Sequence, residues 1–496
     1  MSLVTPKAYS NLVKKGILET GKNCWRICNI EQLSLLLDSQ NYYQAFLECS
    51  QKAGQSLHIA GWEIDARMLV DPLNKNPNLS FRHYLNQISD KVVDIHLLSW
   101  KAPFYLRFGR ERFAGLKWKL NSSSKVKFTH NRYPYCFGSY HEKVAIIDQK
   151  CAFLGGIDLA KMRWDTTCHD GNDDRRRDWN GKRYNPIHDL QFVLTGSIIN
   201  DIAEFIQKRS DKNLFFTQQS PSLTAPVWPD SFSPEIHKIK GAISRTDAEE
   251  GIFEIEDLYV DAIRSAELFI LIENQYFSHH GIIKELALQL KRDNGPEIVI
   301  ILPVNYRGKF ERSIYLTQRN RAIKVLKEAD RYGRLKFYYP ENASPKNFIV
   351  VHSKYMVVDN SFMTLGSANL NYRSMRVDRE INLGLDGQNK EKIQRFIADS
   401  VSRIMADHLG INEKEFAYVF MKNKSLIQTI ETLRNRNTKT LNEIHYTHIP
   451  LPIWLLNFLY PIVDIKLAVP KKNLYLFLIG LLFLILIAAK VINGTY

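Results

Sequence analysis

The chain of 496 residues is long enough for two domains of ordinary size, or for a duplicated fold with a tail. Its 45% hydrophobic and 24% charged residues are typical of a globular protein and exclude a disordered or fibrous chain. The formal net charge of +15 favours an anionic partner, which on charge alone is a nucleic acid, an anionic membrane or a phosphorylated substrate.

The first half of the chain alternates helical and strand patterns after a leader over residues 1–40. Residues 41–54 have helical periodicity and lead into the apolar run 57–66. A polar loop follows Asp165, and long loops inside compact domains are often functional. Four further apolar runs have the length and composition of strands: 92–100, 125–130, 143–148 and 185–196.

The second half repeats this alternation after a linker rich in proline and serine, predicted over residues 216–245. Helical patterns and strand patterns follow each other at 252–266, 268–277, 281–291, 297–304, 312–332 and 335–340. Strands that alternate with helices in both halves predict an α/β fold with a largely buried sheet in each half.

The C-terminal part of the chain differs from both halves. We expect a charged helical extension over residues 411–472 and a transmembrane segment over 473–492. The apolar run in that segment rises about 28 Å as a helix, close to the thickness of a bilayer core. Lys466, Lys471 and Lys472 precede it. The positive-inside rule therefore predicts a single-pass membrane protein with its catalytic domain on the cytoplasmic side.

An internal repeat is the most specific pattern in the sequence. Residues 352–369 place a histidine, a lysine and an aspartate at fixed spacing before Gly-Ser-Ala-Asn. One offset of 211 residues relates five positions of this stretch to the first half: His352 to His141, Lys354 to Lys143, Asp359 to Asp148, Gly366 to Gly155, and Asn369 to Asp158. A single offset indicates an internal duplication. On a strand the histidine and lysine face the same side, a pairing suited to binding and attacking a phosphoryl group.

These two HxKxxxxD motifs resemble those of the phospholipase D superfamily, and paired motifs of this kind are highly specific. The amino-acid sequences of residues 141–165, 272–277 and 366–380 resemble those of the branch that cleaves phosphatidylcholine. The resemblance implies a duplicated phospholipase D fold with two sheet-and-helix lobes, over residues 41–215 and 246–410. It also implies an active site at their interface and a monomer, because one chain holds both motifs.

The same resemblance implies a covalent phosphohistidine intermediate that water or a primary alcohol opens. It assigns His141 as the nucleophile and His352 as the general acid and base, a choice that the residues themselves leave open. Lys143, Lys354 and Asn369 would supply positive charge and a hydrogen-bond donor around the phosphate. Because ammonium groups do this work, we expect no cofactor, and no metal at the active centre.

Other polar residues of the motifs have supporting roles by their position. Asp189 and Glu380 stand where the family carries acids that orient the imidazoles, and which acid serves which histidine stays open. Asp148 and Asp359 are expected to brace the loops of the motif strands. Ser367 either contacts the phosphate or holds the turn that precedes Asn369.

The repeat is unequal at its last position. Asn369 can donate a hydrogen bond to a phosphate oxygen, whereas its counterpart Asp158 would repel that oxygen. We therefore expect Asn369 to face the phosphate and Asp158 to turn aside, paired with a base such as Arg163.

The remaining candidates are weaker. The six cysteines all fall at or before Cys168, and their spacing indicates neither a disulfide framework nor a zinc site. Of the histidines His130, His169 and His188, we expect His169 to be an ordinary residue of the polar loop. Four aromatic residues flank the motifs and either line a substrate pocket or belong to the core: Trp164, Tyr276, Phe277 and Tyr372.

The leading hypothesis is a phospholipase D that releases the headgroup of phosphatidylcholine-like glycerophospholipids and leaves phosphatidic acid. Its partners would be a phospholipid membrane and water or a primary alcohol. The alternatives are a phosphatidyltransferase of the cardiolipin synthase kind and an inactive lipid-binding scaffold, although both His/Lys pairs are intact. A nuclease would suit the charge, but nucleases with this motif are usually single-motif chains that dimerise. We therefore expect no nucleic-acid partner.

Overall fold

The computed structural model describes residues 16–70, 78–92, 94–103, 110–135, 138–209, 227–306, 309–342, 348–435 and 438–445. Within these residues no helix combines the length and the apolar composition that crossing a membrane requires. The predicted transmembrane segment 473–492 lies outside the described residues.

Eight strands belong to the first half: β1 (Arg26–Leu37), β2 (Ser56–Gly61), β3 (Asp94–Trp100), β4 (Val126–Asn131), β5 (Val144–Ile147), β6 (Cys151–Gly155), β7 (Ile187–His188) and β8 (Leu190–Thr195). Ten belong to the second half: β9 (Ile236–Asp247), β10 (Ile252–Phe253), β11 (Phe269–Asn274), β12 (Glu297–Ile301), β13 (Leu335–Glu341), β14 (Val350–Val351), β15 (Lys354–Val358), β16 (Phe362–Gly366), β17 (Glu380–Asp386) and β18 (Thr440–Glu443).

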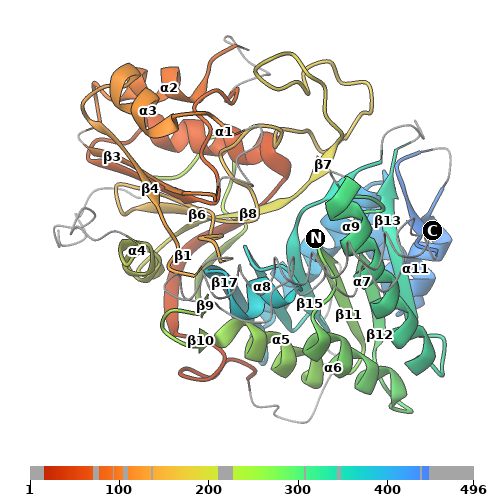
Figure 1. Ribbon diagram of the computed structural model, residues 1–496. Coiled ribbons are helices and arrows are strands. Elements are labelled where there is room, and N and C mark those ends of the chain that lie inside the picture. Colours follow the sequence, from red (N-terminus) through yellow and green to blue (C-terminus); the bar gives the residue numbers. More distant parts are fainter. Residues whose placement is uncertain are drawn as a thin grey trace, which may run out of the picture.

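A single sheet of sixteen strands runs through both halves (Figure 1). From its centre outward, the first half has the order β1-β8-β6-β5-β2-β3-β4. The second half mirrors it as β9-β17-β16-β15-β11-β12-β13, with β18 added at the edge. The antiparallel pair β1–β9 joins the two halves. The structure therefore has one continuous mixed sheet instead of the two separate sheets that the sequence pattern suggests.

The two joining strands lie in regions that the sequence predicts as leader and linker. The outer part of β1 is mostly exposed, and only its last five residues are continuously buried. Pairing on both sides stabilises it, since Leu33 faces Leu194 of β8 and Ile236 of β9. Because these partners are far away in the sequence, a local hydrophobic pattern could not reveal the strands.

The helices cover both faces of the sheet (Figure 1). They are α1 (Asp38–Gln51), α2 (Phe81–Ile88), α3 (Ala114–Asn121), α4 (Ile198–Gln207), α5 (Glu254–Ser265), α6 (His280–Lys291), α7 (Lys309–Ala329), α8 (Tyr372–Arg376), α9 (Glu391–Leu409), α10 (Glu413–Asn423) and α11 (Leu426–Leu433). Neighbouring residues of β1 point to opposite faces, since Leu35 belongs to a core shared by both halves and Leu36 to a core of the first half alone. The shared core, which includes residues of α4 and α9, holds the halves in fixed relation.

Candidate active site

Both motif histidines lie where the two halves meet. His141 precedes β5, and its backbone N–H donates to the carbonyl oxygen of Arg379 at 2.9 Å. His352 precedes β15, and its N–H donates to the carbonyl oxygen of His188 at 2.8 Å. The short parallel pair β7–β14 continues this contact. Each histidine is therefore held by backbone hydrogen bonds from the opposite half of the repeat.

The side chain of each motif histidine also contacts a carboxylate from the opposite half. Nδ1 of His141 lies 2.9 Å from the carboxylate of Glu380, which begins β17. Nδ1 of His352 lies 2.6 Å from Oδ2 of Asp189, which precedes β8. A carboxylate at Nδ1 fixes the ring orientation and leaves Nε2 for the reacting atom. The structure thus brings both predicted acids to the histidines and assigns Glu380 to His141 and Asp189 to His352.

The histidines reach solvent only at their edges, with side chains 14% exposed for His141 and 8% exposed for His352. Burial, followed by the charge of the neighbouring lysine, lowers the pKa of each imidazole well below its usual range. Burial also raises the pKa of Glu380 to about 8 and of Asp189 to about 6. At neutral pH both imidazoles are therefore uncharged, and a neutral imidazole is the nucleophilic form.

Two buried lysines supply positive charge beside the histidines. Nζ of Lys143 donates to the carbonyl oxygen of His141 at 2.5 Å, and Nζ of Lys354 donates to that of His352. Lys354 also donates to Gln275 at 3.4 Å. Burial lowers the pKa of Lys354 to about 7, against the attraction of Asp189. Two ammonium groups taken out of water in one place favour the binding of an anion.

Arg163 is a third cation at the site, and sequence reasoning assigned it another role. Its charge contributes to the lowered pKa of His352 and of Lys354. Its Nε is buried without a hydrogen-bond partner. Within the described residues it shares no hydrogen bond or ion pair with Asp158. The base beside Asp158 is Lys143, so the choice of Arg163 for that role is wrong.

The two unequal positions of the repeat have different surroundings. Asp158 accepts a hydrogen bond from the N–H of Trp62 at 3.0 Å and lies 3.5 Å from Nζ of Lys143. The side chain of Asn369 makes no hydrogen bond to the described part of the chain, although it is 3% exposed and its Oδ1 is buried. Asp158 is therefore occupied by protein partners, and the amide of Asn369 is available to a ligand.

The residues before this position also differ. The hydroxyl of Ser367 donates to Glu380 at 2.5 Å and is wholly buried, which places it on the orienting acid and away from a bound phosphate. Its counterpart is Gly156, where a Cβ would lie 2.1 Å from Oδ1 of Asp189. Asp189 thus occupies the space that a side chain at position 156 would need.

The motif aspartates lie at the far end of their strands from the histidines. Asp148 accepts hydrogen bonds from the backbone N–H groups of residues 54–56, which lead into β2. Asp359 accepts the equivalent bonds from residues 267–269, which lead into β11. These contacts brace the strand pairs β2–β5 and β11–β15, the role expected from their position.

Aromatic residues flank the site on both sides. Trp62 lies edge-on to His141, with ring centroids 6.4 Å apart, and stacks on Trp100. Tyr276 stacks on Tyr315, with centroids 4.0 Å apart. Sequence reasoning missed Trp62, which directly follows β2, because the 211-residue offset places Glu273 and not an aromatic residue opposite it.

The weaker candidates from the sequence have different surroundings: some are buried, Tyr372 is half-buried and His130 is exposed. Trp164 and Phe277 are 4% and 2% exposed and belong to the hydrophobic cores, whereas Tyr372 stacks on His279. His130 packs against Phe128. His169, expected as an ordinary residue of a polar loop, is wholly buried, because Asp165 and other polar side chains enclose it.

Comparison with known proteins shows which proteins this chain is similar to. A family model described as "Cardiolipin synthase, PLD-like domain" matches residues 259–401. Phospholipase D A of Dictyostelium discoideum is 25% identical over 455 residues, which cover 76% of this chain and 36% of that protein. Phospholipase D alpha 3 of Arabidopsis thaliana is 23% identical over 482 residues, covering 69% of this chain and 59% of that protein. The chain thus spans about a third and three fifths of the length of these two relatives.

The architecture also has a counterpart among solved structures. The phosphatidylserine synthase of Haemophilus influenzae aligns over 92% of this chain and 96% of its own, with a TM-score of 0.55. The sequences are 12% identical, so this likeness shows a common fold and no more. The two HxKxxxxD motifs, the family model over residues 259–401 and the curated relatives all support the phospholipase D superfamily as the family that this chain resembles.

Proposed function

We propose that this protein is a phospholipase D that hydrolyses phosphatidylcholine-like glycerophospholipids to phosphatidic acid and a free headgroup. The observation that carries the proposal is the convergence of two imidazole–carboxylate pairs beside two buried lysines. This arrangement offers a nucleophile, a proton donor and positive charge, which are the three requirements of phosphodiester cleavage. The names of the curated relatives support the lipid as substrate.

The first step would join the phosphatidyl group to the enzyme. Nε2 of His141 attacks phosphorus, and the bond from phosphorus to the headgroup oxygen breaks. His352 gives its Nε2 proton to that oxygen. The anionic phosphodiester itself favours the protonated form of His352, which is uncharged in the free protein.

The second step would return the enzyme to its starting state. Water or a primary alcohol attacks phosphorus, the bond from phosphorus to Nε2 of His141 breaks, and His352 takes the proton of the attacking oxygen. Glu380 and Asp189 stabilise the imidazolium character that develops at each ring in turn. Lys143, Lys354 and the amide of Asn369 would stabilise the negative charge on the other phosphate oxygens.

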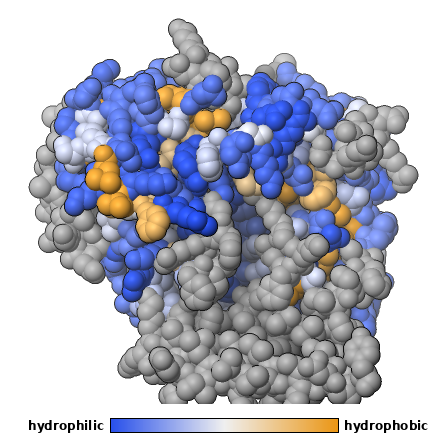
Figure 2. Space-filling model, turned by 45° about the horizontal axis from the view of Figure 1, so that its top comes forward, coloured by the Kyte–Doolittle hydropathy of each residue, from blue (hydrophilic) through white to orange (hydrophobic). Residues whose placement is uncertain are grey.

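We further propose that the protein meets its substrate at a membrane surface. α3 exposes Leu116 and Leu120, and Phe113 before it is 78% exposed, beside Lys117 and Lys119. Hydrophobic side chains flanked by lysines suit a lipid interface with anionic headgroups. Figure 2 shows the hydrophobic residues of one face as small separate patches within a mainly hydrophilic surface.

The sequence further supports an anchor over residues 473–492 with the catalytic domain on the cytoplasmic side. Deletion of residues 473–496 would then release the expressed protein from membranes. A truncated chain that still resists carbonate extraction would contradict the anchor, and activity of the truncated chain on detergent-dispersed lipid is the control for folding.

The deciding experiment for the reaction is product analysis on liposomes of defined phospholipid, with and without a primary alcohol. Hydrolysis through an open phosphohistidine gives phosphatidic acid alone, and a phosphatidyl alcohol in addition when the alcohol is present. A phosphatidyltransferase of the cardiolipin synthase kind would instead consume phosphatidylglycerol and yield cardiolipin with little phosphatidic acid. Liposome binding without any turnover would indicate a lipid-binding scaffold and refute the enzyme.

A further inference from the structure

A second group of titratable side chains lies beneath the active site, and the proposed reaction does not use it. Asp38 begins α1, His169 lies in the loop before β7, His188 is in β7, and Asp407 is in α9. One ligand atom from each lies within 4.8 Å of the others. Asp38, His169 and His188 are wholly buried, and the side chain of Asp407 is 11% exposed.

The spacing of these atoms is that of ligands around one cation. Nε2 of His169 lies 3.3 Å from Oδ2 of Asp38 and 3.9 Å from Oδ2 of Asp407. Nδ1 of His188 lies 3.1 Å from Oδ1 of Asp38 and 3.8 Å from Oδ2 of Asp407. Tetrahedral ligands bound at the usual zinc distances lie about 3.3 Å from each other.

Three of the converging atoms have no hydrogen-bond partner: Oδ2 of Asp38, Nε2 of His169 and Nδ1 of His188. All three belong to wholly buried side chains. Buried polar atoms are almost always hydrogen-bonded. Here the imidazoles face the Asp38 carboxylate at 3.1 and 3.3 Å, yet these three atoms form no hydrogen bond, which needs an explanation. A metal ion bound among them would be a partner for all three.

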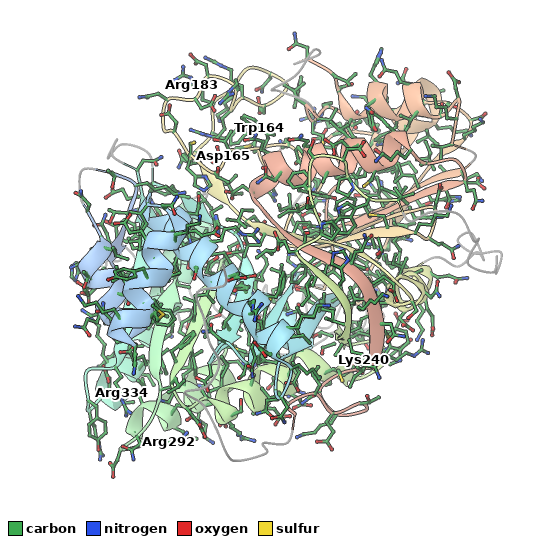
Figure 3. The ribbon with its side chains drawn as sticks, turned by 180° about the vertical axis from the view of Figure 1, so that it is seen from behind. Trp164, Asp165, Arg183, Lys240, Arg292 and Arg334 are labelled. Carbon is green, nitrogen blue, oxygen red and sulfur yellow. The ribbon has the colours of Figure 1, made fainter. Side chains whose placement is uncertain are left out.

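The outer nitrogen of each histidine is paired with a further carboxylate. Nδ1 of His169 contacts Oδ2 of Asp165 at 2.8 Å, and Nε2 of His188 contacts Oε2 of Glu273 at 3.3 Å. Metal-binding histidines nearly always donate their other N–H in this way, because it fixes the tautomer whose lone pair faces the metal. Figure 3 shows Asp165 where the first half approaches the helices of the second.

The side chains of the cluster also carry an excess of negative charge that a divalent cation would balance. Its four carboxylates are Asp38, Asp165, Glu273 and Asp407. Two permanently charged side chains contact them, Arg176 at Asp165 and Lys439 at Asp407, both at 2.8 Å. The imidazole of His408 contacts Glu273 at 2.7 Å and is counted as neutral, because burial lowers its pKa. Four negative and two positive charges leave an excess of two negative charges, and such an excess is costly in the interior unless it is balanced. Either one divalent cation or two protonated imidazoles would balance it.

We propose that Asp38, His169, His188 and Asp407 bind one divalent transition-metal ion, with Zn²⁺ as the best fit. Two imidazole nitrogens and two carboxylate oxygens suit zinc and its first-row neighbours, whereas Ca²⁺ and Mg²⁺ prefer oxygen ligands alone. The site is structural, since all four protein ligands are present and the motif histidines lie outside it.

The position of this site gives it a role at the active centre. Oδ1 of Asp38 accepts a hydrogen bond from the N–H of Asp189 at 3.1 Å, and the N–H of Asp38 donates to the carbonyl oxygen of Asp189 at 2.8 Å. Asp189 is the acid that contacts His352. Because Asp407 comes from the second half, the ion would tie both halves to the backbone that positions this acid.

Metal analysis of the full chain, purified without chelators, tests the proposal. We expect close to one zinc ion per chain, or uptake of one Zn²⁺ or Co²⁺ from buffer, with the visible absorption bands of tetrahedral Co²⁺ after substitution. Removal of the metal should lower the melting temperature. The variant His169→Ala/Asp407→Asn should lose the ion, and His58→Ala, which removes a buried histidine outside the cluster, should retain it.

Two results would overturn the site. One is a wild-type protein that contains no metal and takes up neither Zn²⁺ nor Co²⁺ nor Mn²⁺, which would mean that two protonated imidazoles balance the charge. The other is a metal content that persists in the double variant. If the double variant does not fold, the single change Asp407→Asn and the wild-type uptake measurement still decide. None of these readouts depends on lipid hydrolysis.

Discussion

His141 and His352 each contact a carboxylate of the opposite half, at 2.9 Å and 2.6 Å, whereas the residues that face the phosphate differ between the halves. Asn369 has a free amide in the second half, and its counterpart Asp158 is occupied by Trp62 and Lys143 in the first. In the proposed reaction, proton transfer therefore uses matched groups on both sides of the phosphate. The donor to the phosphate oxygens, Asn369, comes from the second half alone. The carboxylate of Asp158 would repel these oxygens if it faced them.

The largest effect should come from the matched groups. His141→Ala and His352→Ala should each lower turnover by about 10⁴-fold or more, because removal of one member of a cooperating pair disables the unit. The double variant should be no worse than either single one. Headgroup release by purified proteins, with circular dichroism as the control for folding, measures this. A near-normal rate in either variant would remove the proposed mechanism.

The orienting acids should show the next largest effect. Asp189→Asn and Glu380→Gln should each reduce kcat by about a thousandfold with little change in KM, because the amide presents the wrong partner to Nδ1 and changes the tautomer. Similar losses are expected above pH 8, where both acids are ionised and the two contacts are alike. If one variant kept its activity, the two pairs would not be equivalent and the comparison between the halves would fail.

A smaller effect on the rate of the chemical step is expected at Asn369, and none of similar size at its counterpart Asp158. Asn369→Ala should slow the chemical step by about a hundredfold, in the range for the loss of one transition-state donor. Asp158→Asn should affect stability more than chemistry, because this carboxylate holds the N–H of Trp62. Single-turnover rates on folded proteins separate these outcomes, and equal losses from both changes would show that the halves contribute alike.

The last effect concerns stability and not turnover, and it is a change in the pH dependence of the unfolding free energy. Burial raises the pKa of Glu380 from 4.5 to about 8, so in this window the folded protein holds a proton that the unfolded chain releases. The stabilisation from this group is complete below pH 4.5, and it is lost as the pH rises to about 8. The slope for one such proton is about 1.4 kcal/mol per pH unit.

Glu380→Gln removes this proton. The difference in unfolding free energy between the wild type and this variant should therefore fall steadily from pH 5 to pH 8 in urea titrations. His237→Ala, a change at an exposed histidine, serves as a control for general effects of pH. Parallel curves for the wild type and Glu380→Gln would show that Glu380 is ionised throughout this range.

The sequence predicted well what depends on local pattern and on repetition. The helices α1, α5 and α6, and most strands of the two halves, fall where the periodicity places them. The 211-residue offset led to the two histidines, which the structure brings together. What the sequence could not predict depends on distant partners. Strands β1 and β9 are stabilised by pairing across the junction, and their own patterns are weak.

The buried cluster was missed for a related reason. His169 lies in a polar stretch, and nothing in its neighbourhood predicts that Asp38 and Asp407 enclose it. The assignment of Glu380 to His141 and of Asp189 to His352 was open for the same reason. A sequence lists the acids and the imidazoles, and only the arrangement of the two halves shows that they pair crosswise.

Because acids and imidazoles pair crosswise, neither half of this chain contains a complete histidine–carboxylate pair. A fragment with only the first half would contain His141 without Glu380, and Asp189 without His352. A chain with a single copy would need a two-fold symmetric homodimer for the same pairing, in which each subunit supplies its acid to the other. In this chain both copies are covalently joined, so the crosswise contacts form within one chain while the copies differ at Asn369 and Asp158.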